Sequence, residues 1–295
     1  MTRRMIQMKP ARPLAALLVL GAACVLAPFS ASAAQPAGGD SSPIEIALVS
    51  EAESVIPGQT FTVAIHQKMK PGYHTYWRNP GTIGLPTSIE WTLPDGFTAG
   101  EIQWPIPEMT RMAAYNVWGY EKEALLLVDI TAPTSIKPGA SATLKGKATW
   151  MCCGKQCHPG FDDLKLALRV GGKPTWNARW RKQFDLVRSQ QPRASDLWKI
   201  KCSAKGDNYT LSLSPQGNVG DPGGVRFFDY DRQISSDKPQ RVKRKGDAIL
   251  LRLQQEEHTG EKLNRLRGIL VAESSWGKDA RFRALEVDVP IARRE

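Results

Sequence analysis

Short runs of alternating apolar and polar residues, separated by glycine and proline, dominate the chain. In the run from Thr60 to Gln67, for example, every second residue is apolar (Phe61, Val63, Ile65). A period of two is that of a β-strand with one buried face. We therefore expect strands at residues 44–49, 60–67, 88–93, 101–104 and 125–130, on both sides of a turn at 151–160, and at 209–213, 225–230, 248–253, 268–272 and 282–289. Strands of this length and spacing are typical of an immunoglobulin-type β-sandwich.

One segment has a helical period instead. Between Thr175 and Arg188, the apolar residues Trp176, Trp180, Phe184 and Val187 would share one helix face. Pro192 follows, and we place a domain boundary there. The predicted fold is all-β: an immunoglobulin-like β-sandwich over 44–190 that ends in a short helix, then a second, smaller β domain over 191–295.

The first residues have the pattern of a secretory signal peptide. Basic residues (Arg3, Arg4, Lys9, Arg12) precede an apolar stretch at 14–26 and a small-residue cleavage site at 31–33. We expect residues 1–34 to be removed and 35–43 to form a flexible leader; lipoprotein processing at Cys24 is the alternative. No later stretch approaches the roughly 20 apolar residues that span a bilayer, so we expect an exported, soluble protein.

The net charge of +11 falls to +7 after loss of the predicted signal peptide. The densest basic cluster is the run 241–245 (Arg-Val-Lys-Arg-Lys), which we interpret as a solvated strand face. We expect no binding to nucleic acid.

The densest chemistry lies in residues 150–160 (Trp-Met-Cys-Cys-Gly-Lys-Gln-Cys-His-Pro-Gly). If Cys153 and Cys157 form a disulfide, the backbone between them must fold back, and Gly154 tolerates the dihedral angles that this needs. Such a small loop removes little entropy from the unfolded chain. A disulfide that stabilises so little, on an exposed turn, favours a chemical role.

Two other interpretations of the same turn remain open. Cys152, Cys153, Cys157 and His158 offer thiolates and an imidazole, a set suited to copper(I) or zinc, and Met109, Met112 and Met151 could add thioethers. Against this, adjacent cysteines on a strand point to opposite faces. The disulfide could also be an inert part of a structural sandwich. Cys202 is expected to be a lone buried thiol.

Several segments together resemble a known family. They are residues 71–81 (Pro-Gly-Tyr-His-Thr-Tyr-Trp-Arg-Asn-Pro-Gly), 84–87, 102–105, and the Trp150, Cys153, Cys157, Pro159 and Gly160 pattern. In this order they resemble the periplasmic N-terminal region of the thiol:disulfide interchange protein DsbD, and its branch of suppressor-of-copper-sensitivity B proteins. Residues 225–228 and 239–242 resemble the second part of the exported region of that branch.

The resemblance implies a periplasmic immunoglobulin-like domain in which Cys153 and Cys157 exchange electrons, as in a protein-disulfide reductase. The implied partners are a membrane-embedded reductase as donor, here a separate protein, and thioredoxin-like periplasmic proteins as acceptors. No organic cofactor is implied. A cap formed by residues 109–120 would shield the cysteine pair.

The resemblance further implies that Tyr115, Trp118 and Tyr120 form the cap. Tyr73, His74 and Tyr76 would either border the site or pack at the edge of the sandwich. Lys155 and His158 are the local cations that could lower a thiol pKa. Cys152 and His158 depart from the family pattern, so a copper-binding or copper-tolerance protein is the alternative function.

Overall fold

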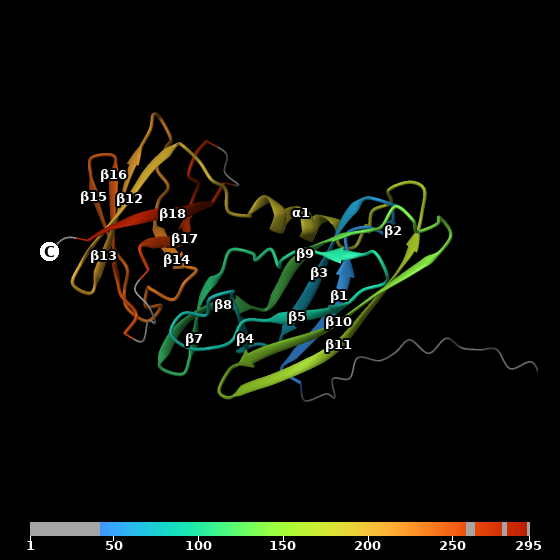
Figure 1. Ribbon diagram of the computed structural model, residues 1–295. Helices are drawn as coiled ribbons and strands as arrows, with labels where there is room; N and C mark the ends of the chain where they lie inside the picture. The colour runs from blue at the N-terminus through green and yellow to red at the C-terminus, as the bar shows by residue number, and fades with distance from the viewer. Residues whose placement is uncertain (1–41, 258–262, 279–281, 294–295) are drawn as a thin grey trace, which may run out of the picture. The chain divides into compact units, whose positions relative to one another are not determined.

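Two β-sheets form the N-terminal sandwich in the computed structural model, which describes residues 42–257, 263–278 and 282–293 (Figure 1). The first sheet has the order β1-β3-β9-β6. Its strands are β1 (Ile44–Ser50), β3 (Thr60–Met69), β9 (Glu123–Thr131) and β6 (Thr98–Ala99). The second sheet has the order β2-β11-β10-β4-β8-β7, with β5 also paired to β10. Its strands are β2 (Ser54–Val55), β11 (Cys157–Val170), β10 (Ser141–Cys153), β4 (His74–Tyr76), β8 (Tyr115–Glu121), β7 (Glu108–Met112) and β5 (Ser88–Thr92).

The core of the sandwich consists of alternate residues from both sheets. Val63 and Val128 of the first sheet pack with Leu144 and Leu168 of the second, and Val63, Val128 and Leu144 are fully buried. In β10, buried and exposed residues alternate strictly from Ser141 to Thr149, as expected for a strand with one face on a core. The prediction of an immunoglobulin-like sandwich is confirmed.

The predicted helix is present but begins later than expected. Helix α1 spans Arg181–Ser189, not 175–188. Residues before it pair with the chain after β1: Thr175 accepts a hydrogen bond from Glu53, and Trp176 bridges Ala52. This extended pairing leaves Trp176 half-exposed, so it does not belong to the buried helix face.

Helix α1 packs on the outer side of the first sheet. Phe184 is fully buried and Trp180 nearly so, and both contact Leu125 and Leu127 of β9. Burial of a phenylalanine contributes roughly 2–3 kcal/mol, so Phe184 anchors the helix.

A third sheet forms the second β domain, in the order β14-β17-β18-β12-β13-β16-β15. Its strands are β14 (Val225–Asp229), β17 (Arg265–Ala272), β18 (Ala284–Arg293), β12 (Trp198–Lys205), β13 (Asn208–Pro215), β16 (Ala248–Gln254) and β15 (Arg241–Lys245). Strand β18 pairs antiparallel with β17, and its last residues pair parallel with β12. It therefore joins the two parts of this sheet.

One predicted strand is absent. Residues 101–104 form no strand: Gln103 makes a single bridge with Leu127, and the prolines at 105 and 107 cannot extend a ladder. Residues 109–120, expected to form a cap, make up most of a β-hairpin in which β7 pairs with β8.

Residues 1–41 lie outside the described ranges, and with them the predicted signal peptide and most of the predicted leader. Across the described ranges, no helix reaches the length and apolar character that a bilayer span requires.

Candidate functional site

The three clustered cysteines lie at the tip of a long β-hairpin. Strands β10 and β11 pair from Ser141 with Arg169 to Cys153 with Cys157. These last two residues form a disulfide, with their Cα atoms 4.1 Å apart. Only three residues separate them, and the Gly154 N–H donates to the Gln156 carbonyl at 3.0 Å. The sandwich thus carries its disulfide in the turn of its longest hairpin.

Gly154 is required for a different reason from the one expected. It does not have a positive φ. A Cβ atom at this position would instead lie 2.8 Å from the carbonyl oxygen of Gly72 and 3.0 Å from the ring of Tyr73. A side chain would push the disulfide turn away from the loop before β4.

The two sulfur-bearing residues differ in exposure. Cys153 is completely buried, whereas Cys157 is half-buried. Lys155 and Gln156 between them are exposed. Of the two cysteines, Cys157 is therefore the residue that solvent reaches.

A small apolar cluster covers the disulfide. Tyr76 of β4 and Val117 of β8 are buried in it with Cys153, and Met112, Met151 and Ile83 pack around them. Val117 and Met112 belong to the β7–β8 hairpin, so this hairpin covers the pair where the cap was expected. Nothing in the local sequence distinguishes Val117 or Ile83. Met112 and Met151 were expected only as possible metal ligands.

The aromatic residues expected in the cap take other positions. Tyr115 is 45% exposed at the hairpin tip. Trp118 and Tyr120 point to the opposite face, into the sandwich core with Trp77, and the Tyr120 hydroxyl donates to the Pro105 carbonyl at 2.8 Å. None of the three belongs to the cluster around the disulfide.

His74 and Tyr76 border the site on strand β4. His74 is paired with Cys153 of the neighbouring strand β10. The ring of His74 meets that of Tyr76 edge-on, with 5.1 Å between their centres. Burial lowers the pKa of His74, and its Nε2 has no hydrogen-bond partner in the described part of the chain. Burial also raises the pKa of Tyr76 to about 12, helped by Cys152. Both groups are therefore uncharged at neutral pH.

Tyr73 and His158 lie on either side of the turn. Their rings are 5.9 Å apart, and both residues are half-buried. The structure thus brings Tyr73, His74, Tyr76 and His158 to the cysteine turn.

Comparison with known proteins identifies the first domain. The family model described as "Thiol:disulfide interchange protein DsbD, N-terminal" matches residues 45–168, which include the disulfide. Residues 45–168 form a DsbD N-terminal domain. This family carries out thiol–disulfide exchange.

One solved structure agrees with this chain at the level of the fold. The N-terminal periplasmic domain of ScsB from Proteus mirabilis matches with a TM-score of 0.54 and 17% identity, over 81% of this chain and 91% of that chain. A protein of unknown function from Porphyromonas gingivalis W83 matches with a TM-score of only 0.23 and 10% identity, over 84% of this chain and 100% of that one, and carries no argument. A comparison with curated protein sequences gave no match.

Cys152 belongs to the core of the DsbD N-terminal domain rather than to its disulfide cluster. It is completely buried among Ile44, Leu126 and Leu164, whereas Cys153 faces the other way. Burial raises the pKa of Cys152 to about 12. In the described part of the chain, no three His, Cys, Asp or Glu side chains are grouped as metal ligands would be.

Cys202 is the second free cysteine, and it lies in the core of the second β domain. The prediction that it is a lone buried thiol is confirmed.

The second β domain holds the cap hairpin of the DsbD N-terminal domain. The Asn116 N–H donates to the Asp237 carboxylate at 2.9 Å, and the Ser236 hydroxyl donates to the Asn116 carbonyl at 2.7 Å. Phe228 packs edge-on against Trp118 and Trp77. The second β domain therefore contacts β8 at Asn116 and Trp118, the two neighbours in sequence of Val117, which packs against Cys153.

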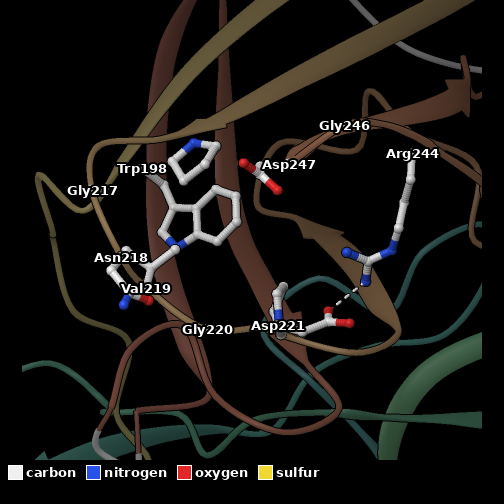
Figure 2. Close-up of a pocket in the computed structure, with 11 residues that line it drawn as sticks. Trp198, Gly217, Asn218, Val219, Gly220, Asp221, Arg244, Gly246 and Asp247 are labelled. Carbon is white, nitrogen blue, oxygen red and sulfur yellow. Dashed lines mark hydrogen bonds and ion pairs between the residues drawn. The ribbon is translucent and has the colours of Figure 1, made fainter.

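A groove of about 670 Å³ opens within the second β domain (Figure 2). Arg244 and Asp221 form an ion pair across it at 2.7 Å. Among the described residues, its walls include no cysteine or histidine, so this groove is not part of the thiol site of the DsbD N-terminal domain.

Proposed function

We propose that the protein is a periplasmic thiol–disulfide oxidoreductase of the protein-disulfide reductase type. It passes electrons from a membrane-embedded reductase to thioredoxin-like periplasmic proteins through Cys153 and Cys157. The observation that carries the proposal is the unequal exposure of the two cysteines in a disulfide at a hairpin tip. In this proposal a partner attacks at Cys157, and Cys153 stays protected until the bond opens.

The exchange needs only sulfur chemistry. A thiolate of the donor attacks the sulfur of Cys157, the Cys153–Cys157 bond breaks, and Cys153 leaves as a thiolate that takes up a proton. A second donor thiol then attacks the mixed disulfide, which leaves the donor oxidised and the pair reduced. Two electrons and two protons have moved, and no organic cofactor takes part.

The second half of the cycle reverses these roles. The Cys157 thiolate attacks the acceptor disulfide and forms a mixed disulfide. Cys153 then attacks Cys157, which restores the internal bond and releases the reduced acceptor. Because Cys153 and Cys157 are paired across the hairpin, the resolving thiol is already beside the bond that it must break.

Single cysteine substitutions test the proposal. Cys153→Ala should accumulate a mixed disulfide between Cys157 and a thioredoxin-like acceptor, because the resolving thiol is missing. Cys157→Ala should trap none, and Cys152→Ala should exchange like the wild type. Non-reducing electrophoresis after alkylation would identify the adducts.

A redox titration in glutathione buffers gives an independent result. The Cys153–Cys157 couple should have a potential above about −300 mV, the range below which structural disulfides lie. A potential below that value, with no adduct in Cys153→Ala, would instead support an inert disulfide in a structural sandwich.

Copper binding remains the second candidate function, with Cys152, Cys153, Cys157 and His158 as its ligands. The packing of Cys152 in the sandwich core, away from the disulfide cluster, does not favour it. Stoichiometric copper(I) uptake by the reduced protein, lost in Cys152→Ser, would support copper binding over exchange.

A further inference from the structure

One face of the third sheet collects basic residues from separate strands. In the pairing of β15 with β16, Arg241 lies opposite Arg252, and Lys243 lies opposite Leu250. In the pairing of β12 with β13, Lys201 lies opposite Ser212, which in turn lies opposite Leu250. Directly opposed residues share a face of a sheet, so these side chains all project from the same side.

The alternating core residues show that this side points to solvent. Cys202, Leu211 and Leu251 face the domain core, and their neighbours along each strand face outward. We call the outward side of β12, β13, β16 and β15 the basic face. Its seven basic residues are all exposed: Lys199, Lys201, Lys205, Arg241, Lys243, Lys245 and Arg252. The other outward residues of these strands are Ser203, Asn208, Thr210, Ser212, Ser214, Ala248, Leu250 and Gln254.

The basic face contains no acidic residue within these four described strands. Asp207 and Asp247 lie in the hairpin turns at its margins. Arg244 belongs to β15 but points to the other side, where it pairs with Asp221. Within the described ranges, none of the seven basic residues of the face forms such an ion pair, and Arg241 opposes Arg252, a like-charge pair that destabilises a sheet.

Protection of a sheet edge explains only part of this pattern. Edge strands often carry lysine to prevent pairing with another chain, and β15 is an edge. Lys199, Lys201 and Lys205, however, lie on β12, which pairs with β13 along its whole length and with β18 at Cys202–Ala204. Protection of the β15 edge does not explain the charges on this strand.

The composition of the face indicates the chemistry of its partner. Centres of protein–protein interfaces are rich in aromatic residues and poor in lysine, whereas Leu250 is the only large apolar residue on the outward side of these strands. Ammonium, guanidinium and hydroxyl groups are ligands for phosphate. A hollow of about 650 Å³ between Lys205, Thr210, Arg241 and Arg252 offers room for a phosphate-bearing headgroup.

We propose that the basic face binds the surface of a bilayer that contains anionic phospholipids. Four strands at about 4.8 Å spacing present the charges over a width of roughly 15 Å, which suits a flat array of phosphates. The binding would be electrostatic and reversible, with no insertion into the bilayer. This role belongs to the second β domain and does not depend on the chemistry of the disulfide.

Vesicle binding tests the inference. The protein recovered after export should sediment with vesicles of phosphatidylcholine mixed with phosphatidylglycerol, and not with vesicles of phosphatidylcholine alone. Raising the salt concentration should release it. Each basic residue near an anionic surface contributes about fivefold, so the combined Lys201→Gln, Lys243→Gln and Arg252→Gln variant should bind roughly 100-fold more weakly.

A control variant with the same net charge isolates the face. Lys145→Gln, Lys165→Gln and Lys182→Gln remove three exposed lysines from the sandwich and α1, and binding should stay close to that of the wild type. An equal loss in both variants would overturn the inference, as would binding to pure phosphatidylcholine. Retention on heparin without binding to anionic vesicles would also overturn it, in favour of a soluble polyanion.

Discussion

His74 is a buried histidine on β4, directly opposite Cys153 on the neighbouring strand β10. Burial lowers its pKa, so it is neutral beside the intact disulfide. When the bond opens, a thiolate appears opposite a ring whose Nε2 has no partner among the described residues. An imidazole in this position can hold a proton next to the sulfur and stabilise the thiolate.

We therefore expect His74→Gln to make the reduced pair less acidic. The pH midpoint for alkylation of the reduced protein by iodoacetamide should rise by about one unit. His66→Gln serves as the control, because His66 lies on β3, where it pairs with Glu123, and does not belong to the cluster around the disulfide. Equal midpoints in the wild type and His74→Gln would show that His74 acts only in packing.

The sequence predicts the cysteines of this site correctly, but not the residues that cover them. The cysteine spacing and the family resemblance point to Cys153 and Cys157, which the structure joins. Trp118 and Tyr120 were expected over the pair, but residues 117 and 118 point to opposite faces of β8, and the smaller Val117 faces the disulfide. Which face a strand residue takes depends on register, and the local sequence does not determine the register of this hairpin.

At the scale of elements, the β7–β8 hairpin packs over Cys153 through Met112 and Val117. Its strand β8 is held by β4 on one side, and Asn116 is held by Ser236 and Asp237 of the second β domain. The tip of the hairpin has none of these contacts; Ala113 there has a φ of 53° and Tyr115 is exposed. We therefore expect the second domain to limit access to Cys153.

Removal of one of these contacts should make the disulfide easier to reach. Asp237→Ala eliminates the carboxylate that accepts from the Asn116 N–H, and a hydrogen bond to a charged group contributes about 1.5–3 kcal/mol. We expect the disulfide to be reduced roughly tenfold faster by a small phosphine. Alkylation of the free thiols in samples taken at successive times would measure the rate of reduction.

Asp207→Ala is the matched control, since this exposed carboxylate lies in the β12–β13 turn. It should leave the rate of reduction unchanged. If Asp237→Ala also leaves it unchanged, then the second domain does not restrain the cap hairpin.

Elements with a strong period were predicted well, and those that depend on long-range pairing were not. The strands predicted at 125–130 and 248–253 lie close to the bounds of β9 and β16, whereas β4, β8 and β12 were not predicted. The helix was extended too far, because Trp176 fits the helical period but pairs with Ala52 of a distant segment. The basic face could not be predicted either, since it joins lysines about 40 residues apart on β12 and β15.

At the scale of the whole molecule, one buried carboxylate links stability to pH. Asp229 ends strand β14 and is completely buried. Its carboxylate accepts hydrogen bonds from the backbone N–H groups of Asp231, Gln233 and Ile234. Burial nevertheless raises its pKa to about 7. This carboxylate organises the loop that leads to Ser236 and Asp237.

The sign of the effect follows from the two protonation states. Below the pKa of an unfolded aspartate, near 4, both folded and unfolded chains hold the proton. Between that value and about 7, only the unfolded chain is ionised, so stability falls as the pH rises. Above about 7 the loss is complete.

Between pH 5 and pH 8, we expect the ionisation of Asp229 to lower the free energy of unfolding by roughly 2–3 kcal/mol. Asp229→Asn cannot ionise and should lose this part of the pH dependence, while Asp207→Asn should keep it. Urea denaturation at a series of pH values would measure the difference. Identical slopes for the wild type and Asp229→Asn would contradict the prediction.

The position of β18 between β17 and β12 has a consequence for biosynthesis. The strands of the sandwich are all complete by Val170, whereas the third sheet stays divided until residues 284–293 have been made. In a nascent chain, the sandwich that carries the disulfide can therefore form early, and the third sheet is completed last. Until then, β12 presents an open edge to chaperones and to neighbouring chains.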